Sequence, residues 1–471
     1  MKNISYLLIG LFMSICQAQN DNKNYTDAFK LIDVWLESQK DYEAIPGITA
    51  MVVRDQDLVW SGAYGKSNIE QDTDIKRSTL CSICSITKTF TAVAIMKLVD
   101  EGKIKLDDKV KDILPHFKVV QKYPDGGFIT IRSLLSHSSG LPRDSGHNYW
   151  SAPDFPFPSE NELNAVLKEL ETESPVGANL SYSNLGYALL GQIIEQVSGM
   201  PFEQYLKTHV LIPLQMSDSY VGIKGSLYGN KHAVGYTAVN RNGIRKRANL
   251  YQTKAISPAA GLSTSILDLA KYASWQFRLR NASVKEVLNP SSLRKMHEVQ
   301  SESKNGSRTW GFGFEVFSDK SGNKWVSHGG ICPGYVSYLK MNLTNKMGYG
   351  LMVNSNRVNA IQLINGIMGI MKKAGSISKN DAKNIDLEEY TGYYNLNPWN
   401  SEYYISRWGK GLVALYLPAK NPVDSMYFYE HKGNDTFRLI GSDEEIVFKR
   451  DKNGKVYQVL NGGNYHPKMK Y

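Results

Sequence analysis

The chain lacks a hydrophobic run long enough to span a membrane as a mature helix. Its N-terminal apolar stretch, Ile4–Ile15, falls short of the about 20 residues that a bilayer requires. This stretch follows Lys2 and precedes Cys16 and then polar residues, an order typical of a secretory signal. We therefore expect residues 1–18 to be a cleaved signal peptide and the protein to be secreted or periplasmic. Lipid anchoring through Cys16 is an alternative that we disfavour, because the residue before it is too bulky for the usual lipobox.

Cysteine is scarce as well. The four cysteines are Cys16, Cys81, Cys84 and Cys332, and removal of the signal peptide leaves an odd number, so at most one internal disulfide can form. Cys81 and Cys84 form a Cys-x-x-Cys pair, but a zinc ribbon needs a second pair. We interpret the two as small side chains that pack beside a helix start. Cys332 could lie near them, and the pairing stays open. We expect no metal ion and no cofactor.

Clustered basic residues are also missing. The net charge is +10, but Lys and Arg are spread along the chain, which is typical of a solvated surface. The sequence shows no basic stripe of the kind that nucleic-acid binding uses. We therefore expect no nucleic-acid partner.

Motifs of two common enzyme classes are absent. Gly-x-Ser-x-Gly does not occur, which argues against the nucleophile elbow of α/β-hydrolases. Gly65-Lys66-Ser67 is similar to the end of a phosphate-binding loop, but Trp60 occupies the position of the first glycine. Neither class is therefore expected.

The most informative motif that is present is Ser85-Ile86-Thr87-Lys88, at the start of an apolar segment that continues to Met96. A segment of this kind predicts a buried helix, which Gly102 would end. Residues three apart lie on one helix face, so the Lys88 amine can return to the Ser85 hydroxyl. A serine at a helix start also keeps a backbone N–H that can bind an oxyanion. Four other Ser-x-x-Lys matches lack this setting: Ser301, Ser321, Ser337 and Ser376.

A serine hydroxyl needs a base within hydrogen-bond reach before it can attack. Lys88 can serve if its surroundings keep the amine neutral. Tyr182, in Tyr182-Ser183-Asn184, can serve if a neighbouring ammonium stabilises its phenolate, and the three groups can share one proton. Asn184 can both donate and accept hydrogen bonds toward a substrate. We predict Ser85, Lys88 and Tyr182 as catalytic residues and Asn184 as a substrate-binding residue.

His328-Gly329-Gly330 lies between two alternating runs and is predicted to end one strand of a hairpin. The two glycines would leave room for substrate to lie along the strand backbone. The N–H of Ile331 would be the second oxyanion donor, because preorganised backbone donors give acyl-transfer sites much of their power. His328, Gly329, Gly330 and Ile331 are therefore predicted to bind substrate.

Together these motifs resemble the penicillin-recognising serine enzymes: class C β-lactamases, D-alanyl-D-alanine carboxypeptidases, D-aminopeptidases and related esterases. The resemblance covers about residues 45–370, and its further matches are Pro46-Gly47-Ile48-Thr49, residues 129–142, residues 257–265 and Tyr335. It implies that Ser85 is acylated, that Lys88 and Tyr182 exchange its proton, and that Asn184 contacts the substrate. His328 takes the place of the lysine in the Lys-Thr-Gly motif of β-lactamases.

The histidine at this position affects the expected substrate. A permanently charged lysine recognises the carboxylate of a β-lactam, whereas histidine titrates near neutrality. Activity on carboxylate-bearing substrates should therefore fall as the pH rises through the titration of His328. The resemblance implies an exported serine hydrolase that forms an acyl-enzyme on Ser85 and acts on a peptide amide of D-amino-acid or peptidoglycan type, or on a small ester. The alternatives are a penicillin-binding or sensor protein without turnover and a true β-lactamase.

The expected fold class is α+β. Residues 19–371 would form a β-lactamase/transpeptidase-like catalytic domain with a helical insertion from Ser85 to about Ala282. Its strands are expected near residues 49–53, 58–62, 311–317, 324–327, 336–342 and 348–354, and the late strands would pair with the first two. Residues 372–385 have the composition of a linker. Residues 386–471 alternate in short runs broken by turn residues, which predicts a small all-β, barrel-like domain similar to the lipocalin-like domains of some family members.

Overall fold

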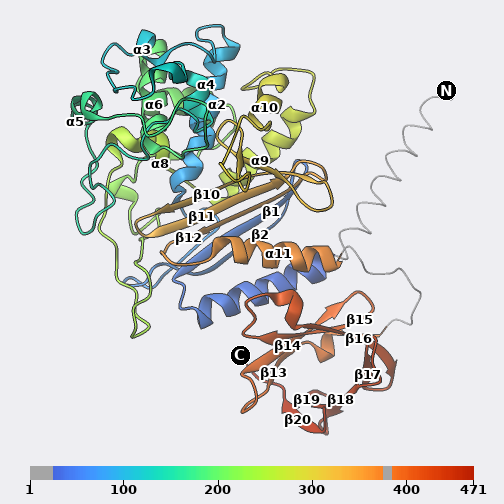
Figure 1. Ribbon diagram of the computed structural model, residues 1–471. Coiled ribbons are helices and arrows are strands. Elements are labelled where there is room, and N and C mark those ends of the chain that lie inside the picture. Colours follow the sequence, from blue (N-terminus) through green and yellow to red (C-terminus); the bar gives the residue numbers. More distant parts are fainter. Residues whose placement is uncertain (1–24, 375–384, 471) are drawn as a thin grey trace, which may run out of the picture. The chain divides into compact units, whose positions relative to one another are not determined.

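The computed structural model describes residues 25–374 and 385–470 (Figure 1). These residues form two compact units: one comprises residues 45–360, and the other combines the chain before residue 45 with the chain after residue 360. The expected signal peptide, with Cys16, lies outside the described residues, as does most of the expected linker. No helix within the described ranges has the length and apolar composition needed to cross a membrane.

The larger unit is built on a nine-stranded antiparallel sheet (Figure 1). In sheet order its strands are β3 (Thr73–Asp74), β2 (Asp57–Asn68), β1 (Gly47–Arg54), β12 (Met347–Val353), β11 (Tyr335–Asn342), β10 (Lys324–Cys332), β9 (Glu315–Ser318), β8 (Thr309–Trp310) and β7 (Ser301–Glu302). The interior strand β1 is buried along all but its last residue, which suits its apolar sequence. The predicted pairing of an early strand with a late one is confirmed, since β1 pairs with β12.

The strand expected near residues 311–317 is wrong at its start. The chain reverses between β8 and β9, and the strand begins only at Glu315. Gly313 takes a φ of +82° in this reversal, and a Cβ there would lie 2.9 Å from Ala92 Cβ in the adjoining helix. The close approach of the loop to that helix therefore overrides the alternation that suggested a strand.

Helices fill the predicted insertion between the early and late strands. The α-helices of this unit are α2 (Thr87–Asp100), α3 (Val110–Ile113), α4 (Ile131–Leu135), α5 (Glu160–Val166), α6 (Asn184–Ser198), α7 (Phe202–Leu206), α8 (Ser257–Ala260), α9 (Ile266–Arg280) and α10 (Pro290–Met296). Nearly all of α2 is buried, as its apolar sequence predicts. Helix α9 packs on β12, where Gly348 and Gly350 allow a close approach to its side chains.

A short 3-10 helix, η1 (Cys84–Ile86), leads directly into α2. The chain that enters η1 is held by a three-stranded sheet of β4 (Cys81–Ser82), β6 (Leu262–Thr264) and β5 (Tyr220–Val221). The Ile83 N–H extends this pairing by donating to the Leu262 carbonyl over 2.9 Å. The chain before Ser85 is therefore held by β6, and the chain after it continues into helix α2.

The second unit contains an eight-stranded antiparallel sheet, the helix over residues 25–42 and α11 (Ala360–Ala374). The strands follow chain order: β13 (Gly392–Asn395), β14 (Glu402–Trp408), β15 (Gly411–Leu417), β16 (Met426–Gly433), β17 (Thr436–Leu439), β18 (Glu445–Arg450), β19 (Val456–Asn461) and β20 (Asn464–Pro467). A bridge between Tyr394 and Lys468 brings the last strand back to the first, so the sheet is a nearly closed barrel. The predicted fold class, α+β followed by an all-β domain, is confirmed.

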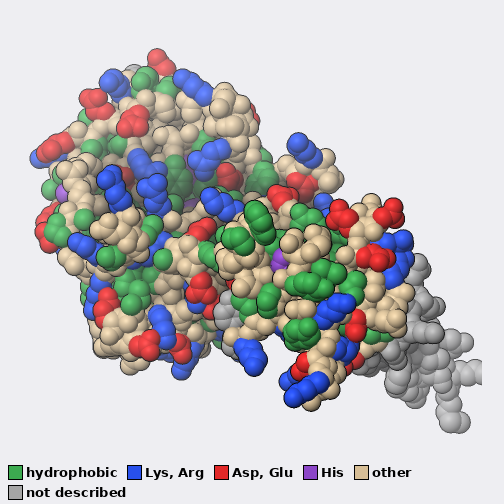
Figure 2. All heavy atoms as spheres, turned by 90° about the horizontal axis from the view of Figure 1, so that it is seen from below, with side chains coloured by type: hydrophobic (Ala, Val, Ile, Leu, Met, Phe, Trp, Pro, Cys, Tyr) green, Lys and Arg blue, Asp and Glu red, His purple; other side chains and the backbone are tan. Residues whose placement is uncertain are grey.

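Charged side chains of both signs are interspersed on the face of the molecule shown in Figure 2. Several Lys and Arg residues on the described surface pair with carboxylates, as Lys66 does with Asp74 and Arg278 does with Glu286. Such exposed pairs contribute little to stability.

Candidate active site

Ser85 lies in a sharp turn at the start of α2. The residue before it, Cys84, has a φ of +52°, a left-handed conformation that costs a non-glycine residue about 1–2 kcal/mol. Such a conformation persists only where the surroundings fix it. Here Thr87 Oγ1 donates to the Cys84 carbonyl over 2.6 Å and accepts from the Leu262 N–H over 2.9 Å. The turn leaves Ser85 partly exposed between two buried neighbours.

Lys88 lies one turn further on and is fully buried. Its Nζ lies 3.3 Å from Ser85 Oγ, and it donates to Asn184 Oδ1 over 2.7 Å and to the Ala259 carbonyl over 2.8 Å. Burial holds the pKa of the Lys88 amine well below its ordinary value, and the positive charge of Arg143 adds to this effect. The predicted proximity of Ser85 and Lys88 is therefore present in the structure.

Asn184 is the first residue of α6 and is buried between Lys88 and Asp144. Its Oδ1 accepts from Lys88, and its Nδ2 donates to Asp144 Oδ1 over 2.8 Å. Its backbone N–H donates to the Arg143 carbonyl over 2.7 Å. The structure thus shows Asn184 as a link between Asp144 and Lys88, whereas the sequence predicted a contact with substrate.

Tyr182 lies two residues before α6, against the same lysine. The Lys88 Nζ is 4.8 Å from the centroid of its ring, and the Arg143 guanidinium is 5.1 Å from it. Burial raises the pKa of Tyr182 to about 12, and a hydrogen bond with Ser85 and the charge of Arg143 only partly oppose this. The phenol therefore keeps its proton at neutral pH.

His328 lies on β10 and is buried. Its Nδ1 is 2.7 Å from the Gly329 carbonyl, and its ring meets that of Trp310 edge-on at 5.3 Å. Burial, with a smaller effect of the Lys88 charge, lowers the pKa of His328 to about 3. The expected titration of this histidine near neutrality is therefore wrong. Trp310 and its neighbours bury the ring, and the sequence could not show this contact.

The two glycines after His328 have different surroundings. A Cβ on Gly330 would lie 2.1 Å from the Ile83 carbonyl oxygen and 3.1 Å from Cys84 Cβ, so Gly330 lets η1 pack directly on the strand. A Cβ on Gly329 would instead meet the ring of Tyr338 at 3.1 Å. The close approach that these glycines allow is thus to the protein's own backbone and side chains.

Ile331 lies on the edge of β10 beside η1. Strand β9 pairs with β10 only along Lys324–Ser327, so the later part of β10 has a strand neighbour on one side alone. The two-residue loop of the hairpin makes Cys332 and Tyr335 a hydrogen-bonded pair. Because hydrogen-bonded and non-hydrogen-bonded pairs alternate, the N–H of Ile331 points away from β11, toward this edge.

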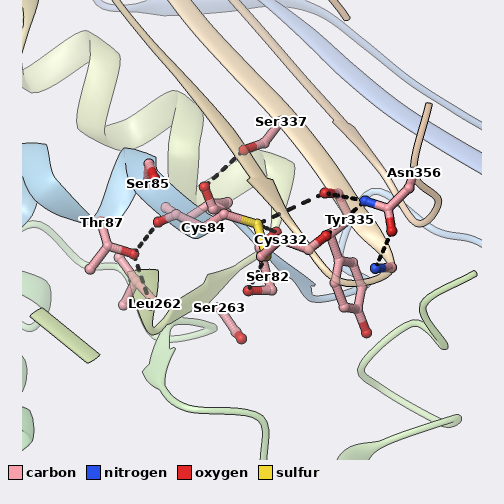
Figure 3. The surroundings of a disulfide bond; sticks show 12 residues. Ser82, Cys84, Ser85, Thr87, Leu262, Ser263, Cys332, Tyr335, Ser337 and Asn356 are labelled. Atoms are coloured by element: carbon pink, nitrogen blue, oxygen red, sulfur yellow. Dashed lines mark hydrogen bonds between the residues drawn. A yellow bond between two sulfur atoms is a disulfide. The ribbon is translucent and has the colours of Figure 1, made fainter. Parts of the chain in front are cut away.

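Cys84 forms a disulfide with Cys332, with 5.7 Å between their Cα atoms (Figure 3). The interpretation of Cys84 as a simple packing residue is therefore wrong, since the hairpin brings Cys332 next to it. Cys81 is a free and buried thiol, which fits that interpretation. No cluster of three or more His, Cys, Asp or Glu side chains in the described ranges could hold a metal ion.

Three groups near the site were not identified from the sequence. Asp144 accepts from both Asn184 and the Tyr149 hydroxyl. His137 accepts from the Ser183 N–H over 3.1 Å, and its ring lies 4.3 Å from that of Tyr182, so it positions the tyrosine. The Ala259 carbonyl accepts from Lys88. His137 and Ala259 lie in motifs that carried the resemblance, and Asp144 comes two residues after one of them, but no local pattern shows their contacts with residues so far along the chain.

The chain belongs to the beta-lactamase family, because the Beta-lactamase family model matches residues 34–364. Protein flp of Staphylococcus aureus (strain MW2) is 30% identical over 344 residues, which cover 70% of this chain and 63% of that protein. The chain thus spans less than two thirds of the length of this relative. The resemblance found in the motifs is confirmed, and the family assignment supports the general class of serine hydrolases.

Solved structures show the same fold. The octameric penicillin-binding protein homologue from Pyrococcus abyssi has a TM-score of 0.63 at 25% identity, over 93% of this chain and 99% of that chain. The beta-lactamase/D-alanine carboxypeptidase from Yersinia pestis, solved with citrate, has a TM-score of 0.61 at 20% identity, over 74% of this chain and 99% of that chain.

Proposed function

We propose that this protein is an exported serine hydrolase that forms an acyl-enzyme on Ser85 and acts on a peptide amide of D-amino-acid type or on a small ester. The observation that carries the proposal is the hydrogen bonding of Lys88. A neutral amine has two N–H groups and one lone pair. The Asn184 oxygen and the Ala259 carbonyl, at 2.7 and 2.8 Å, take the two N–H groups, which leaves the lone pair for the Ser85 hydroxyl at 3.3 Å.

Burial changes the pKa values of the two candidate bases, Lys88 and Tyr182, in opposite directions. Desolvation lowers the pKa of Lys88 and raises that of Tyr182, so burial favours the neutral form of both groups. Lys88 then accepts the Ser85 proton as Oγ attacks the substrate carbonyl carbon. Tyr182 donates its proton to the leaving nitrogen or oxygen as the bond to it breaks, and regains a proton from Lys88. One proton is thus passed among three coupled groups.

The negative charge that develops on the carbonyl oxygen needs donors in fixed positions. The backbone N–H of Ser85 belongs to the first turn of a helix, where such groups have no intrahelical partner. The N–H of Ile331 points toward the same edge, as the pairing of β10 requires. We assign these two groups to the oxyanion hole, with Gly330 allowing the close contact between η1 and β10. Water would then hydrolyse the acyl-enzyme at the same site.

The charges around the site favour an ester or peptide over a β-lactam. A neutral, buried His328 cannot provide the permanent positive charge that a lysine would offer to a carboxylate. The names of the solved neighbours, a penicillin-binding protein homologue and a beta-lactamase/D-alanine carboxypeptidase, are consistent with a peptidoglycan-derived peptide.

Steady-state hydrolysis by the purified mature protein tests the proposal. The substrates are p-nitrophenyl acetate, nitrocefin and a D-amino-acid p-nitroanilide, each compared with Ser85→Ala. We expect turnover of the ester or the anilide that disappears in the variant. Activity that survives Ser85→Ala would refute the mechanism. A single burst of acylation by nitrocefin without turnover would instead indicate a penicillin-binding or sensor protein.

A further inference from the structure

The disulfide joins the two halves of the proposed oxyanion hole. Cys84 comes immediately before Ser85, Cys332 comes immediately after Ile331, and 248 positions of sequence separate the two cysteines. Each cysteine is thus the covalent neighbour of one proposed donor. This inference rests on the proposed function of Ser85 and Ile331.

The bond forms where the sheet gives β10 little support. Strand β9 leaves β10 after Ser327, so the edge from His328 to Cys332 faces η1 instead of another strand. A hydrogen bond of 2.8 Å from Ser337 Oγ, on β11, to the Ile83 carbonyl also crosses this junction. A covalent bond between Cys84 and Cys332 holds the two segments together where backbone pairing does not.

Both ends of the bond are attached to rigid surroundings. On the strand side, Asn356 Nδ2 donates to the Cys332 carbonyl over 2.8 Å, and Asn356 Oδ1 accepts from the Gly334 N–H over 2.7 Å. On the other side, Cys84 has the left-handed φ of +52° that turns the chain into Ser85, and Thr87 holds its carbonyl. A change at either sulfur would therefore be felt at the adjoining N–H.

We propose that the Cys84–Cys332 disulfide is a positioning element, which fixes the separation of the Ser85 and Ile331 N–H groups and thereby stabilises the transition state. Oxyanion donors act on charge that exists only during the reaction. Loosening them should therefore lower kcat and kcat/KM together and leave KM unchanged. A disulfide that served stability alone would lower the melting temperature without changing kcat of the folded protein.

The surroundings favour a permanent bond over a reversible switch. Both cysteines are buried, so a reducing agent cannot reach the sulfurs unless the hairpin opens. Burial also raises the pKa of the remaining thiol, Cys81, to about 12, which leaves it without the thiolate needed for exchange. The bond would form by oxidation in the exported compartment, where disulfides persist.

The first experiment counts thiols and measures kinetics. Denatured mature protein should take up one alkyl group before reduction and three after it. Cys332→Ala and Cys84→Ala should lower kcat on p-nitrophenyl acetate by about tenfold to a hundredfold, with KM within about twofold of wild type. The matched control is Cys81→Ala, which removes a buried thiol from β4 without breaking the bond and should keep the wild-type kcat. Circular dichroism and the melting temperature establish that each variant is folded at the assay temperature.

The outcomes separate the positioning role from the proposed function. A folded Cys332→Ala protein with wild-type kcat and a lower melting temperature would overturn the positioning role. If the wild-type protein hydrolyses none of the substrates, the proposed function fails, and hydrogen exchange still tests the geometry. Peptides that span residues 82–88 and 327–336 should exchange faster in Cys332→Ala than in Cys81→Ala. Equal exchange in the two variants would overturn the inference independently of activity. If Cys332→Ala is unfolded, the same comparison is made on Cys84→Ala, and after it on Cys332→Ser.

Discussion

Lys88 Nζ donates to Asn184 Oδ1 over 2.7 Å, and this bond holds a buried amine beside the nucleophile. Asn184 also donates to Asp144, so its amide is held in place by Asp144 while it accepts from Lys88. A base displaced by a fraction of its hydrogen-bond distance loses much of its rate advantage. The position of Lys88 thus depends on a residue that the sequence suggested only as a substrate contact.

Replacing this amide tests its positioning role. We expect Asn184→Ala to lower kcat on p-nitrophenyl acetate by about tenfold to a hundredfold, because Lys88 loses one of its two strong acceptors. Gln192→Ala is the matched control, since it removes an amide from the same helix that bonds His116 and Asn164 instead. An Asn184→Ala enzyme as active as the Gln192→Ala enzyme would show that the amide does not position the base.

The charge of Arg143 should control the acidic side of the pH profile. Lys88 must be neutral to accept a proton, so activity falls as the pH falls through its pKa. Arg143 lowers that pKa, and Arg143→Gln should therefore move the acidic limb of kcat/KM for a neutral ester to higher pH. Arg308→Gln is the control. The charge of Arg308 lowers the pKa of His328 and of Tyr182, whereas the charge that lowers the pKa of Lys88 is that of Arg143.

Salt provides a second check on the same prediction. Arg143 is largely exposed, so its effect on Lys88 is screened by ions. The difference between the limbs of wild type and Arg143→Gln should therefore shrink as the ionic strength rises. A difference that does not depend on salt would mean that the substitution acts through packing on Tyr182.

The buried state of His328 predicts the absence of a pH effect that its ordinary pKa would cause. With a pKa of about 3, the ring is neutral throughout the range from about pH 5 to about pH 8. The ratio of kcat/KM for a carboxylate-bearing ester to that for a neutral ester should therefore be constant over this range. A ratio that falls near pH 6.5 would show that His328 is charged in the free enzyme and recognises the carboxylate.

The parts of the site that the sequence predicted are those determined by local geometry. The spacing of Ser85 and Lys88 places them one helical turn apart wherever the helix lies. The alternation around His328 likewise predicted a hairpin, and a strand was expected near residues 49–53, where β1 lies. These features depend on neighbours in the chain, so the sequence contains them.

The parts that it did not predict depend on contacts between distant segments. The pairing of Cys84 with Cys332 depends on the packing of β10 beside η1. The neutral state of His328 depends on its burial, to which the edge-on contact with Trp310 contributes. The contact of Gly330 with the Ile83 carbonyl was not predicted for the same reason. No local pattern specifies such packing, and the electrostatics of the site follow from it.

The contact of Gly330 with Ile83 leads to a prediction about stability. Gly330→Ala places a Cβ 2.1 Å from a backbone carbonyl oxygen that the disulfide and Ser337 hold in place, so the backbone must move. We expect a loss of about 2 kcal/mol in the free energy of unfolding in urea, together with a marked loss of kcat. The matched control is Gly329→Ala, whose Cβ would meet the ring of Tyr338 at 3.1 Å, a side chain that can shift. Its cost should stay below about 1 kcal/mol. Equal destabilisation by the two substitutions would mean that strand propensity decides the effect. The contact between β10 and η1 would then not require a glycine at position 330.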